Sequence, residues 1–142
     1  MPKRKASAVW KGGLKGGTGT FKTPSGNISG NYSFSSRFEE GAGSNPEELL
    51  AAAHAACFSM ALSAQLEGNG TPPTNVETNA VCTVEKVGAG FKITTMHLTT
   101  RASVPNIDAA KFEQIANAAL DGCPVSQALK GNVKFEMDAK LT

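Results

Sequence analysis

The sequence predicts an α+β fold, in a single domain that spans residues 1–142. Residues 76–104 and 133–141 alternate apolar and polar side chains with the period of two that is typical of strands. Residues 49–66 form an alanine-rich apolar run of helical length. Strands and helices come in blocks along the chain rather than in strict alternation, which favours α+β over α/β. Hydrophobic residues make up 40% and charged residues 18% of the chain, as in ordinary globular proteins.

The first part of the chain is predicted to form strands. Residues 5–11 place Ala6, Ala8 and Trp10 on one face, and residues 19–23 can pair back onto them. Residues 24–27 (PSGN) are a strong turn signal, after which residues 28–34 form a third strand. Residues 39–44 form a polar, glycine-containing loop.

A long helix follows with clear start signals. Asn45 suits the N-cap, Pro46 the first helical position, and Glu48 the third position of a capping box. Residues 49–66 are apolar nearly all round, which indicates a buried helix. A chain of this length can hardly surround such a helix alone, so we expect an intertwined homodimer with antiparallel sheets around long central helices.

The second half predicts a hairpin, two helices and a last strand. Residues 67–75 break the chain, and residues 76–87 and 91–104 form a hairpin across the turn at residues 88–90. Phe91 and Ile93 are out of phase with Met96 and Leu98, so a bulge is expected near residues 94–95. Asp108 caps a second helix that ends at residues 121–122. A short helix at residues 124–130 and a strand at residues 133–141 complete the chain.

Charge and hydropathy exclude several classes of protein. The net charge is only +2, and the basic cluster at residues 3–5 lies at the chain end, so no nucleic-acid partner is expected. No apolar run approaches the roughly 18 residues of a membrane span, so no membrane partner is expected. The N-terminus lacks the apolar region of an export signal, which predicts a cytoplasmic protein. An odd total of three cysteines cannot form a complete disulfide framework.

The cysteines are the first candidates for chemistry, because a cysteine that ionises to a thiolate is a strong nucleophile. Cys123 precedes a helix that begins at Pro124, where free N–H groups favour a thiolate, but a small hydrophobic cap is an equal alternative. Cys57 lies within the apolar helix, where inert packing is the simpler interpretation unless a cation lies nearby. Cys82, on the apolar side of a strand, is expected to be structural.

The histidines and the glycines do not indicate a cofactor. His54 shares a helical face with Cys57, so a Cys–His nucleophilic pair is conceivable, although a satisfied core histidine is favoured. His97 lies opposite Met96 and Leu98 and is expected to be exposed. The cysteines and histidines lack zinc-ligand spacing, and no phosphate-binding glycine motif follows a strand. We therefore expect no metal and no nucleotide.

Two segments contain Cys57 and Cys123 within longer motifs. They are residues 37–39 with 44–62 (RFE and SNPEELLAAAHAACFSMAL) and residues 122–129 (GCPVSQAL). Both segments resemble the osmotically inducible protein C (OsmC) family. Residues 53–57 (AHAAC) place the chain nearer to the OsmC branch than to the organic hydroperoxide resistance branch. The order of elements also agrees along nearly the whole chain.

The resemblance implies a homodimeric, thiol-dependent peroxidase that reduces organic hydroperoxides without a cofactor. Cys57 would be the peroxidatic thiol and Cys123 the resolving thiol, joined by an intrasubunit disulfide. Arg37 would stabilise the Cys57 thiolate, and Glu47 would hold Arg37, with both supplied by the partner subunit. A dithiol reductant of the lipoyl type would recycle the disulfide. The alternative function is a redox-sensing or binding protein in which turnover is incidental.

Elementary chemistry is consistent with these roles for Arg37 and Glu47, but each residue also has a simpler interpretation. Arg37 is a permanent cation that could make a buried thiol acidic, or else a surface arginine beside Glu39 and Glu40. Because Glu48 is accounted for by capping, Glu47 is left to hold Arg37, or to act only as a favourable first-turn acid. An apolar substrate pocket is expected from three residues, which are Phe38, Phe58 and Met60.

Overall fold

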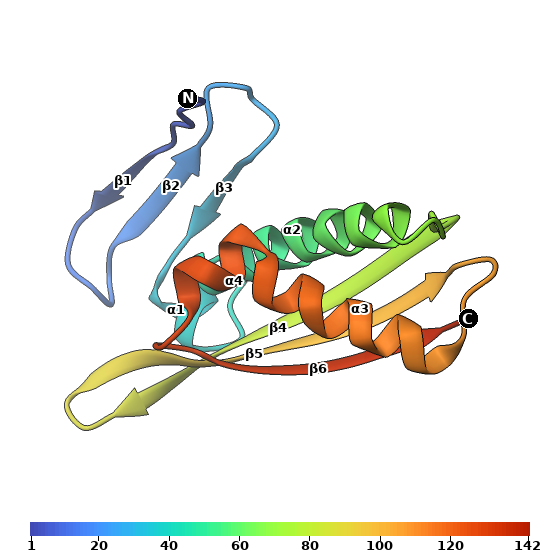
Figure 1. Cartoon of the computed structure of the whole chain (residues 1–142). Helices are drawn as coiled ribbons and strands as arrows, with labels where there is room; N and C mark the ends of the chain where they lie inside the picture. The colour runs from blue at the N-terminus through green and yellow to red at the C-terminus, as the bar shows by residue number, and fades with distance from the viewer. The chain divides into compact units, whose positions relative to one another are not determined.

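A computed structural model describes residues 1–142 and confirms the α+β class. Contacts between Cα atoms divide the chain into two compact units, Met1–Leu49 and Leu50–Thr142. The boundary lies inside the long helix, and the prediction of one domain stays a prediction. The elements, coloured along the chain in Figure 1, are β1 Ser7–Lys11, β2 Thr18–Lys22, β3 Ser29–Tyr32, α1 Phe34–Phe38, α2 Pro46–Gly68, β4 Asn75–Val87, β5 Gly90–Ser103, α3 Ala109–Gly122, α4 Pro124–Leu129 and β6 Lys134–Leu141.

The N-terminal unit is built on an antiparallel sheet in the order β1-β2-β3, as expected from its turn signals. Gly19 of β2 lies between two aromatic rings, and a Cβ there would stand only 2.5 Å from Tyr32 and 2.6 Å from Trp10. The ring centroids of Trp10 and Tyr32 are 5.3 Å apart. Glycine at this position is therefore required by close packing of the rings.

A short helix, α1, replaces the end of the third predicted strand, so the prediction of a strand through residues 28–34 is wrong at its end. Strand β3 ends at Tyr32 because Ser33 caps α1: its hydroxyl accepts from the Ser36 N–H, and the Ser36 hydroxyl accepts from the Ser33 N–H. This is a capping box with serine in place of the usual glutamate. It positions Arg37 on the last turn of α1.

Helix α2 begins where the sequence predicts. The Asn45 side chain accepts from the Glu48 N–H at 2.8 Å, which confirms the N-cap. The reciprocal half of the capping box is absent, because the Glu48 carboxylate accepts from the Ser44 hydroxyl instead. Gly68 ends the helix, two residues beyond the expected Leu66.

The expectation that no apolar run is long enough to span a membrane is wrong for α2. By length and mean hydropathy this helix could cross a membrane. Alanine supplies this hydropathy between the polar residues of the helix. Core helices of soluble proteins meet the same criterion, and only 22% of the relevant α2 window is buried within this chain. The exposed side of α2 is therefore apolar.

The C-terminal unit contains a sheet in the order β4-β5-β6, with α2 and α3 on one face (Figure 1). The β4–β5 hairpin is antiparallel, and Thr83 and Val84 pair with Thr95 and Ile93, which leaves Thr94 as the extra residue of the predicted bulge. The last strand departs from the antiparallel expectation, because β6 pairs with β5 in parallel. Helices α3 and α4 form the crossover that a parallel pair requires.

The core of this unit lies between the helices and the sheet. It is formed by every fourth residue along α2, alternate residues of β5, and one stripe of α3. The fully or nearly fully buried apolar members are Phe58, Leu62, Leu66, Met96, Leu98, Ala102, Phe112, Ile115, Ala116, Ala119 and Cys123. Asp108 caps α3 by accepting from the Lys111 N–H at 2.8 Å, as predicted. The only residue among these that carries chemistry is Cys123.

Candidate active site

Two cysteines meet within the C-terminal unit. The Sγ atoms of Cys57 and Cys123 lie 2.9 Å apart, and one thiol donates a hydrogen bond to the other. Both are free thiols. Cys57 is partly exposed, whereas Cys123 is fully buried at 0% exposure. The structure therefore brings together the two sulfurs for which the sequence suggested chemistry, and it leaves Cys57 as the one that solvent reaches.

Local sequence explains why Cys123 stands opposite Cys57. Proline disfavours a helical backbone in the residue before it, so Pro124 interrupts the helix at Cys123. Cys123 accordingly has an extended backbone, and it serves both as the C-cap of α3 and as the N-cap of α4. The junction between two helices thus places this side chain against α2.

The surroundings of the pair affect the two thiols in opposite directions. Burial raises the pKa of the Cys57 thiol, and the hydrogen bond to Cys123 raises it further. Burial also opposes ionisation of Cys123, but the polar groups of Cys57, Ser126 and Val125 around it lower its pKa. Burial therefore opposes a thiolate at Cys57 within this unit, and a nearby cation would favour one.

A buried polar pair lies next to the sulfurs. His54 is fully buried, and its Nε2 lies 2.8 Å from the Ser126 hydroxyl oxygen. Burial lowers the pKa of His54, so the ring is neutral. The ring contacts Ser126 rather than Cys57, so the structure does not form the conceivable Cys57–His54 nucleophilic pair. His97, expected to be exposed, is only partly so.

The N-terminal unit holds the expected arginine and glutamate together. The Glu47 carboxylate accepts from Arg37 Nε at 3.1 Å and from Arg37 Nη2 at 2.8 Å. The Glu47 side chain is 6% exposed and the Arg37 side chain 36% exposed. This geometry uses one edge of the guanidinium and leaves Nη1 outside the pair. Ser36 also donates to the Ser44 carbonyl at 2.7 Å, which fixes α1 beside the start of α2.

The three expected pocket residues have different surroundings. Phe38 lines a largely apolar cavity of about 230 Å³ together with Arg37, whose guanidinium lies 5.1 Å from the Phe38 ring centre. Phe58 is fully buried in the core of the other unit, and Met60 is 76% exposed on α2. The substrate role of these residues stays a prediction.

Comparison with known proteins decides the family. The family model described as OsmC-like protein matches residues 39–138, which include Glu47, Cys57 and Cys123. The chain is 47% identical over 138 residues to peroxiredoxin OsmC of Escherichia coli K12, and the match covers 96% of each chain. The chain belongs to the OsmC-like family. This confirms the resemblance found in the sequence.

Other members agree in sequence and in fold. Organic hydroperoxide resistance protein OhrB of Bacillus subtilis is 34% identical over 99 residues, which cover 69% of this chain and 71% of that protein. The crystal structure of OhrB superimposes with a TM-score of 0.75 and covers 96% of this chain and 98% of that one. The higher identity to OsmC than to OhrB agrees with the predicted branch.

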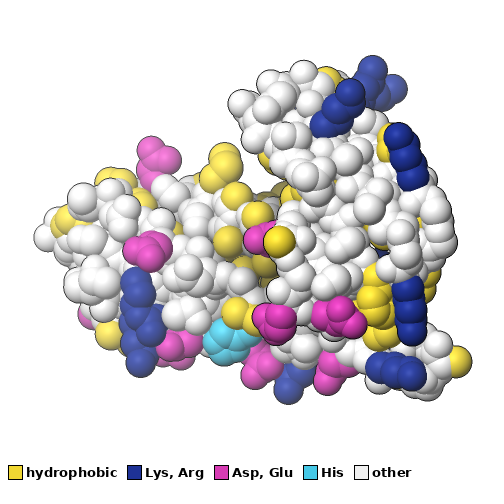
Figure 2. Space-filling view, turned by 180° about the vertical axis from the view of Figure 1, so that it is seen from behind, with side chains coloured by type: hydrophobic (Ala, Val, Ile, Leu, Met, Phe, Trp, Pro, Cys, Tyr) yellow, Lys and Arg dark blue, Asp and Glu magenta, His cyan; other side chains and the backbone are white.

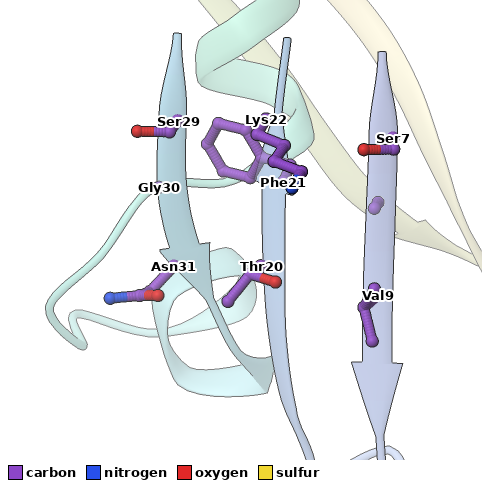
Figure 3. Close-up of a pocket in the computed structure, with 9 residues that line it drawn as sticks. Ser7, Val9, Thr20, Phe21, Lys22, Ser29, Gly30 and Asn31 are labelled. Atoms are coloured by element: carbon purple, nitrogen blue, oxygen red, sulfur yellow. The ribbon is translucent and has the colours of Figure 1, made fainter. Parts of the chain in front are cut away.

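The N-terminal unit of this OsmC-like chain also contains a larger cavity than the one beside Arg37. It has a volume of about 420 Å³ and lies on the sheet of the N-terminal unit (Figure 3). Its labelled lining residues, which include Lys22, Ser29 and Asn31, come from all three strands, and neither a cysteine nor a carboxylate is among them. This cavity contains none of the predicted site residues.

Sequence reasoning missed some residues beside the predicted ones. Ser126, whose hydroxyl lies 2.8 Å from His54 Nε2, belongs to the GCPVSQAL segment, but the sequence indicated no role of its own for it. Trp10, Tyr32 and Phe34 line the cavity beside Arg37. The Ser33–Ser36 spacing could have predicted α1, because it matches a capping box with serine at both positions. Helix α1 supplies Phe34, Arg37 and Phe38 to this cavity.

Proposed function

We propose that this chain is a thiol-dependent peroxidase that reduces organic hydroperoxides to alcohols. Cys57 would be the attacking thiolate and Cys123 the thiol that resolves the product. The observation that supports this best is the 2.9 Å separation of the two sulfurs, with Cys57 the more exposed. Two relatives carry names of the same kind, peroxiredoxin and organic hydroperoxide resistance protein.

The cycle follows from thiol chemistry. The Cys57 thiolate attacks one peroxide oxygen, the O–O bond breaks, and the alcohol leaves after it takes up a proton. Cys57 is then a sulfenic acid. The Cys123 thiolate attacks its sulfur, the S–O bond breaks, and hydroxide leaves as water after protonation. A dithiol reduces the resulting intrasubunit disulfide by exchange and is itself oxidised to a disulfide. We propose a lipoyl-type dithiol, as the family suggests.

Arg37 would supply the cation that Cys57 lacks within its own unit. Burial raises the pKa of Cys57, and an opposite charge within about 4–6 Å lowers such a pKa by about 1–3 units. Glu47 holds Arg37 by its Nε and Nη2 edge, which leaves Nη1 to face a thiolate or a peroxide oxygen. We propose that the partner subunit donates this Arg37–Glu47 pair.

A homodimer would also cover the apolar side of α2. Four alanines and one methionine are exposed on this helix, and the methionine is 76% exposed. They are Ala52, Ala53, Ala56, Met60 and Ala64. Small side chains let two helices approach closely, and exposure of so much apolar surface is unfavourable in water. We therefore propose that α2 packs against the partner subunit.

The proposed substrate and compartment follow from the surface and the thiols. The cavity beside Arg37 and Phe38 exposes mostly apolar surface, which would favour an alkyl or aryl hydroperoxide over hydrogen peroxide. Figure 2 shows basic and acidic side chains scattered among uncharged surface on one face, which suits a small-molecule substrate better than nucleic acid. Three free thiols suit the cytoplasm.

The test is consumption of cumene hydroperoxide in the presence of a dithiol. We expect Cys57→Ser to abolish turnover, and Cys123→Ser to stop at a Cys57 sulfenic acid. Cys82→Ser is the matched control, because Cys82 packs against the core on β4, and it should retain turnover. Full activity of Cys57→Ser would refute the proposal. A single turnover without recycling by any dithiol would favour the redox-sensor alternative.

A further inference from the structure

A polar contact joins α2 to α4 inside the core of the C-terminal unit. His54 Nε2 and the Ser126 hydroxyl oxygen lie 2.8 Å apart, although the two residues are 72 positions apart in the sequence. They are 0% and 2% exposed, and the other ring nitrogen of His54, Nδ1, is buried without a hydrogen-bond partner. A buried polar atom without a partner destabilises the folded state, and an apolar side chain would avoid that cost. The histidine therefore requires an explanation.

The sulfur contact lies one helical turn away from this polar contact. Cys57 follows His54 by three residues on α2, and Cys123 precedes Ser126 by three residues at the N-cap of α4. Residues three apart lie on the same side of a helix, one turn from each other. The polar contact, at 2.8 Å, and the sulfur contact, at 2.9 Å, thus join the same two helices, which run in opposite directions. The Gln127 N–H donates to the Cys123 carbonyl at 3.0 Å, so a displacement of α4 would also displace Cys123.

Helix α4 needs contacts outside itself to stay in place. It has only six residues, Pro124–Leu129, and a helix of this length is unstable alone in water. No side-chain hydrogen bond caps its start, and Ser126 is its one buried residue. The Gln127 side chain donates to the Asp121 carbonyl, which ties α4 to α3, whereas Ser126 ties it to α2. Its apolar contacts with the core are non-directional, so the hydrogen bond at Ser126 is the contact that can fix α4 along α2.

We propose that His54 and Ser126 are positioning residues, whose hydrogen bond holds α4 against α2 and keeps the Cys123 sulfur within reach of the Cys57 sulfur. Nε2 can donate to the hydroxyl or accept from it, so either tautomer of the ring makes this bond. A hydrogen bond has a preferred direction as well as a distance, so it restricts both rotation and translation of α4. An apolar side chain at position 54 would fill the space without that restriction. The consequence for catalysis rests on the proposed peroxidase function, but the contact itself does not.

The position of Cys123 would decide what happens to oxidised Cys57. In one reaction the Cys123 thiolate attacks the sulfur of the Cys57 sulfenic acid, the S–O bond breaks, and hydroxide leaves as water after protonation. In the other, the sulfenate attacks a second hydroperoxide, the O–O bond breaks, an alcohol leaves, and Cys57 becomes a sulfinic acid that a dithiol does not reduce. A Cys123 held in contact with Cys57 favours the first reaction, because the reacting sulfurs are already in place.

Exchange with glutathione disulfide measures this positioning without a peroxide. In a Cys82→Ser chain, Cys57 and Cys123 are the only thiols, and their oxidation to a disulfide reduces one glutathione disulfide to two glutathiones. The equilibrium constant of this exchange increases with the effective concentration of one thiol at the other. Ser126→Ala and His54→Leu should each lower the constant about tenfold, the size expected for one buried hydrogen bond. His54→Gln, which keeps a hydrogen-bonding side chain, should recover part of the loss.

Two controls separate positioning from a general loss of stability. Ser59→Ala removes another hydroxyl of α2, one that contacts the Thr78 hydroxyl of β4 at 2.8 Å, and should leave the constant unchanged. The double variant His54→Leu/Ser126→Ala should lose no more than either single variant, because the effects of residues that act through one contact do not add. In excess cumene hydroperoxide, the variants with a lower constant should also accumulate more Cys57 sulfinic acid.

Two results would overturn the inference. One is an equilibrium constant in Ser126→Ala that equals that of Ser59→Ala; this variant removes a single buried oxygen, so the result decides the question even where His54→Leu does not fold. The other is a double variant whose loss equals the sum of the two single losses in free energy. Absence of peroxide turnover, with the expected glutathione constants, would refute the proposed function and leave the positioning role standing.

Discussion

The substitution Glu47→Gln tests how Arg37 is held. Glutamine keeps the shape of the side chain but removes the negative charge of the carboxylate, which accepts hydrogen bonds from Arg37 Nε and Nη2. Glu48→Gln is the matched control, because Glu48 is the neighbouring first-turn acid of α2 but is exposed and contacts Ser44. Both variants lose the same helix-dipole interaction and the same net charge. Any difference between them measures the Arg37–Glu47 pair.

The magnitude follows from burial. Hydrogen bonds to a charged group contribute about 1.5–3 kcal/mol each to stability when desolvated. The Glu47 side chain is 6% exposed but Arg37 is 36% exposed, so solvent screens the pair. We therefore expect Glu47→Gln to lower the free energy of unfolding by about 1–2 kcal/mol, against at most about 0.5 kcal/mol for Glu48→Gln.

Activity should follow the same order for a different reason. An Arg37 that stabilises the Cys57 thiolate should lower the pKa of Cys57 by about 1–3 units. In Glu47→Gln a displaced guanidinium lowers that pKa less, so less thiolate is present and kcat/KM should fall by about tenfold or more. Urea unfolding and initial rates with cumene hydroperoxide measure the two effects. Equal stability and equal kcat/KM in the two glutamine variants would refute the reasoning.

Three further predictions concern other parts of the fold. Gly19→Ala should displace the rings of Trp10 and Tyr32, cost about 1–3 kcal/mol and shift the emission of the single tryptophan; unchanged emission would contradict the packing. Burial lowers the pKa of His54 below 6.5, so the stability it contributes is present above that pH and is lost as the pH falls below it. In His54→Leu the free energy of unfolding, measured with urea, should therefore fall less steeply as the pH drops below 6.5, by up to about 1.4 kcal/mol per pH unit. The same pH dependence in both chains would contradict this prediction. Cys82→Ser should keep its rate with cumene hydroperoxide, and a large fall would give Cys82 a role that its core packing does not suggest.

The elements that the sequence predicted well depend on local signals. The Asn45 and Asp108 caps and the bulge at Thr94 each follow from spacing within a few residues. The parallel pairing of β6 could not be predicted in this way, because register between distant strands depends on the crossover. Helix α1 was missed because its cap uses serine where glutamate is usual.

Some residues of the candidate site could likewise be predicted from the sequence, and others could not. Motif resemblance identified Cys57 and Cys123, and the structure places their sulfurs in contact. The same resemblance gave no role to Ser126, because its contact with His54 is recognisable only once α2 and α4 are packed together. Nor could composition show that Phe58 faces the core, since α2 is apolar nearly all round.

Peptide mapping after exposure to one equivalent of cumene hydroperoxide tests the central claim most directly. The Cys57 and Cys123 peptides should be recovered joined by a disulfide, with Cys82 still alkylatable as a free thiol. Recovery of Cys57 as a stable sulfinic acid, with Cys123 still reduced, would contradict the account, because a sulfur 2.9 Å away should capture the sulfenic acid first.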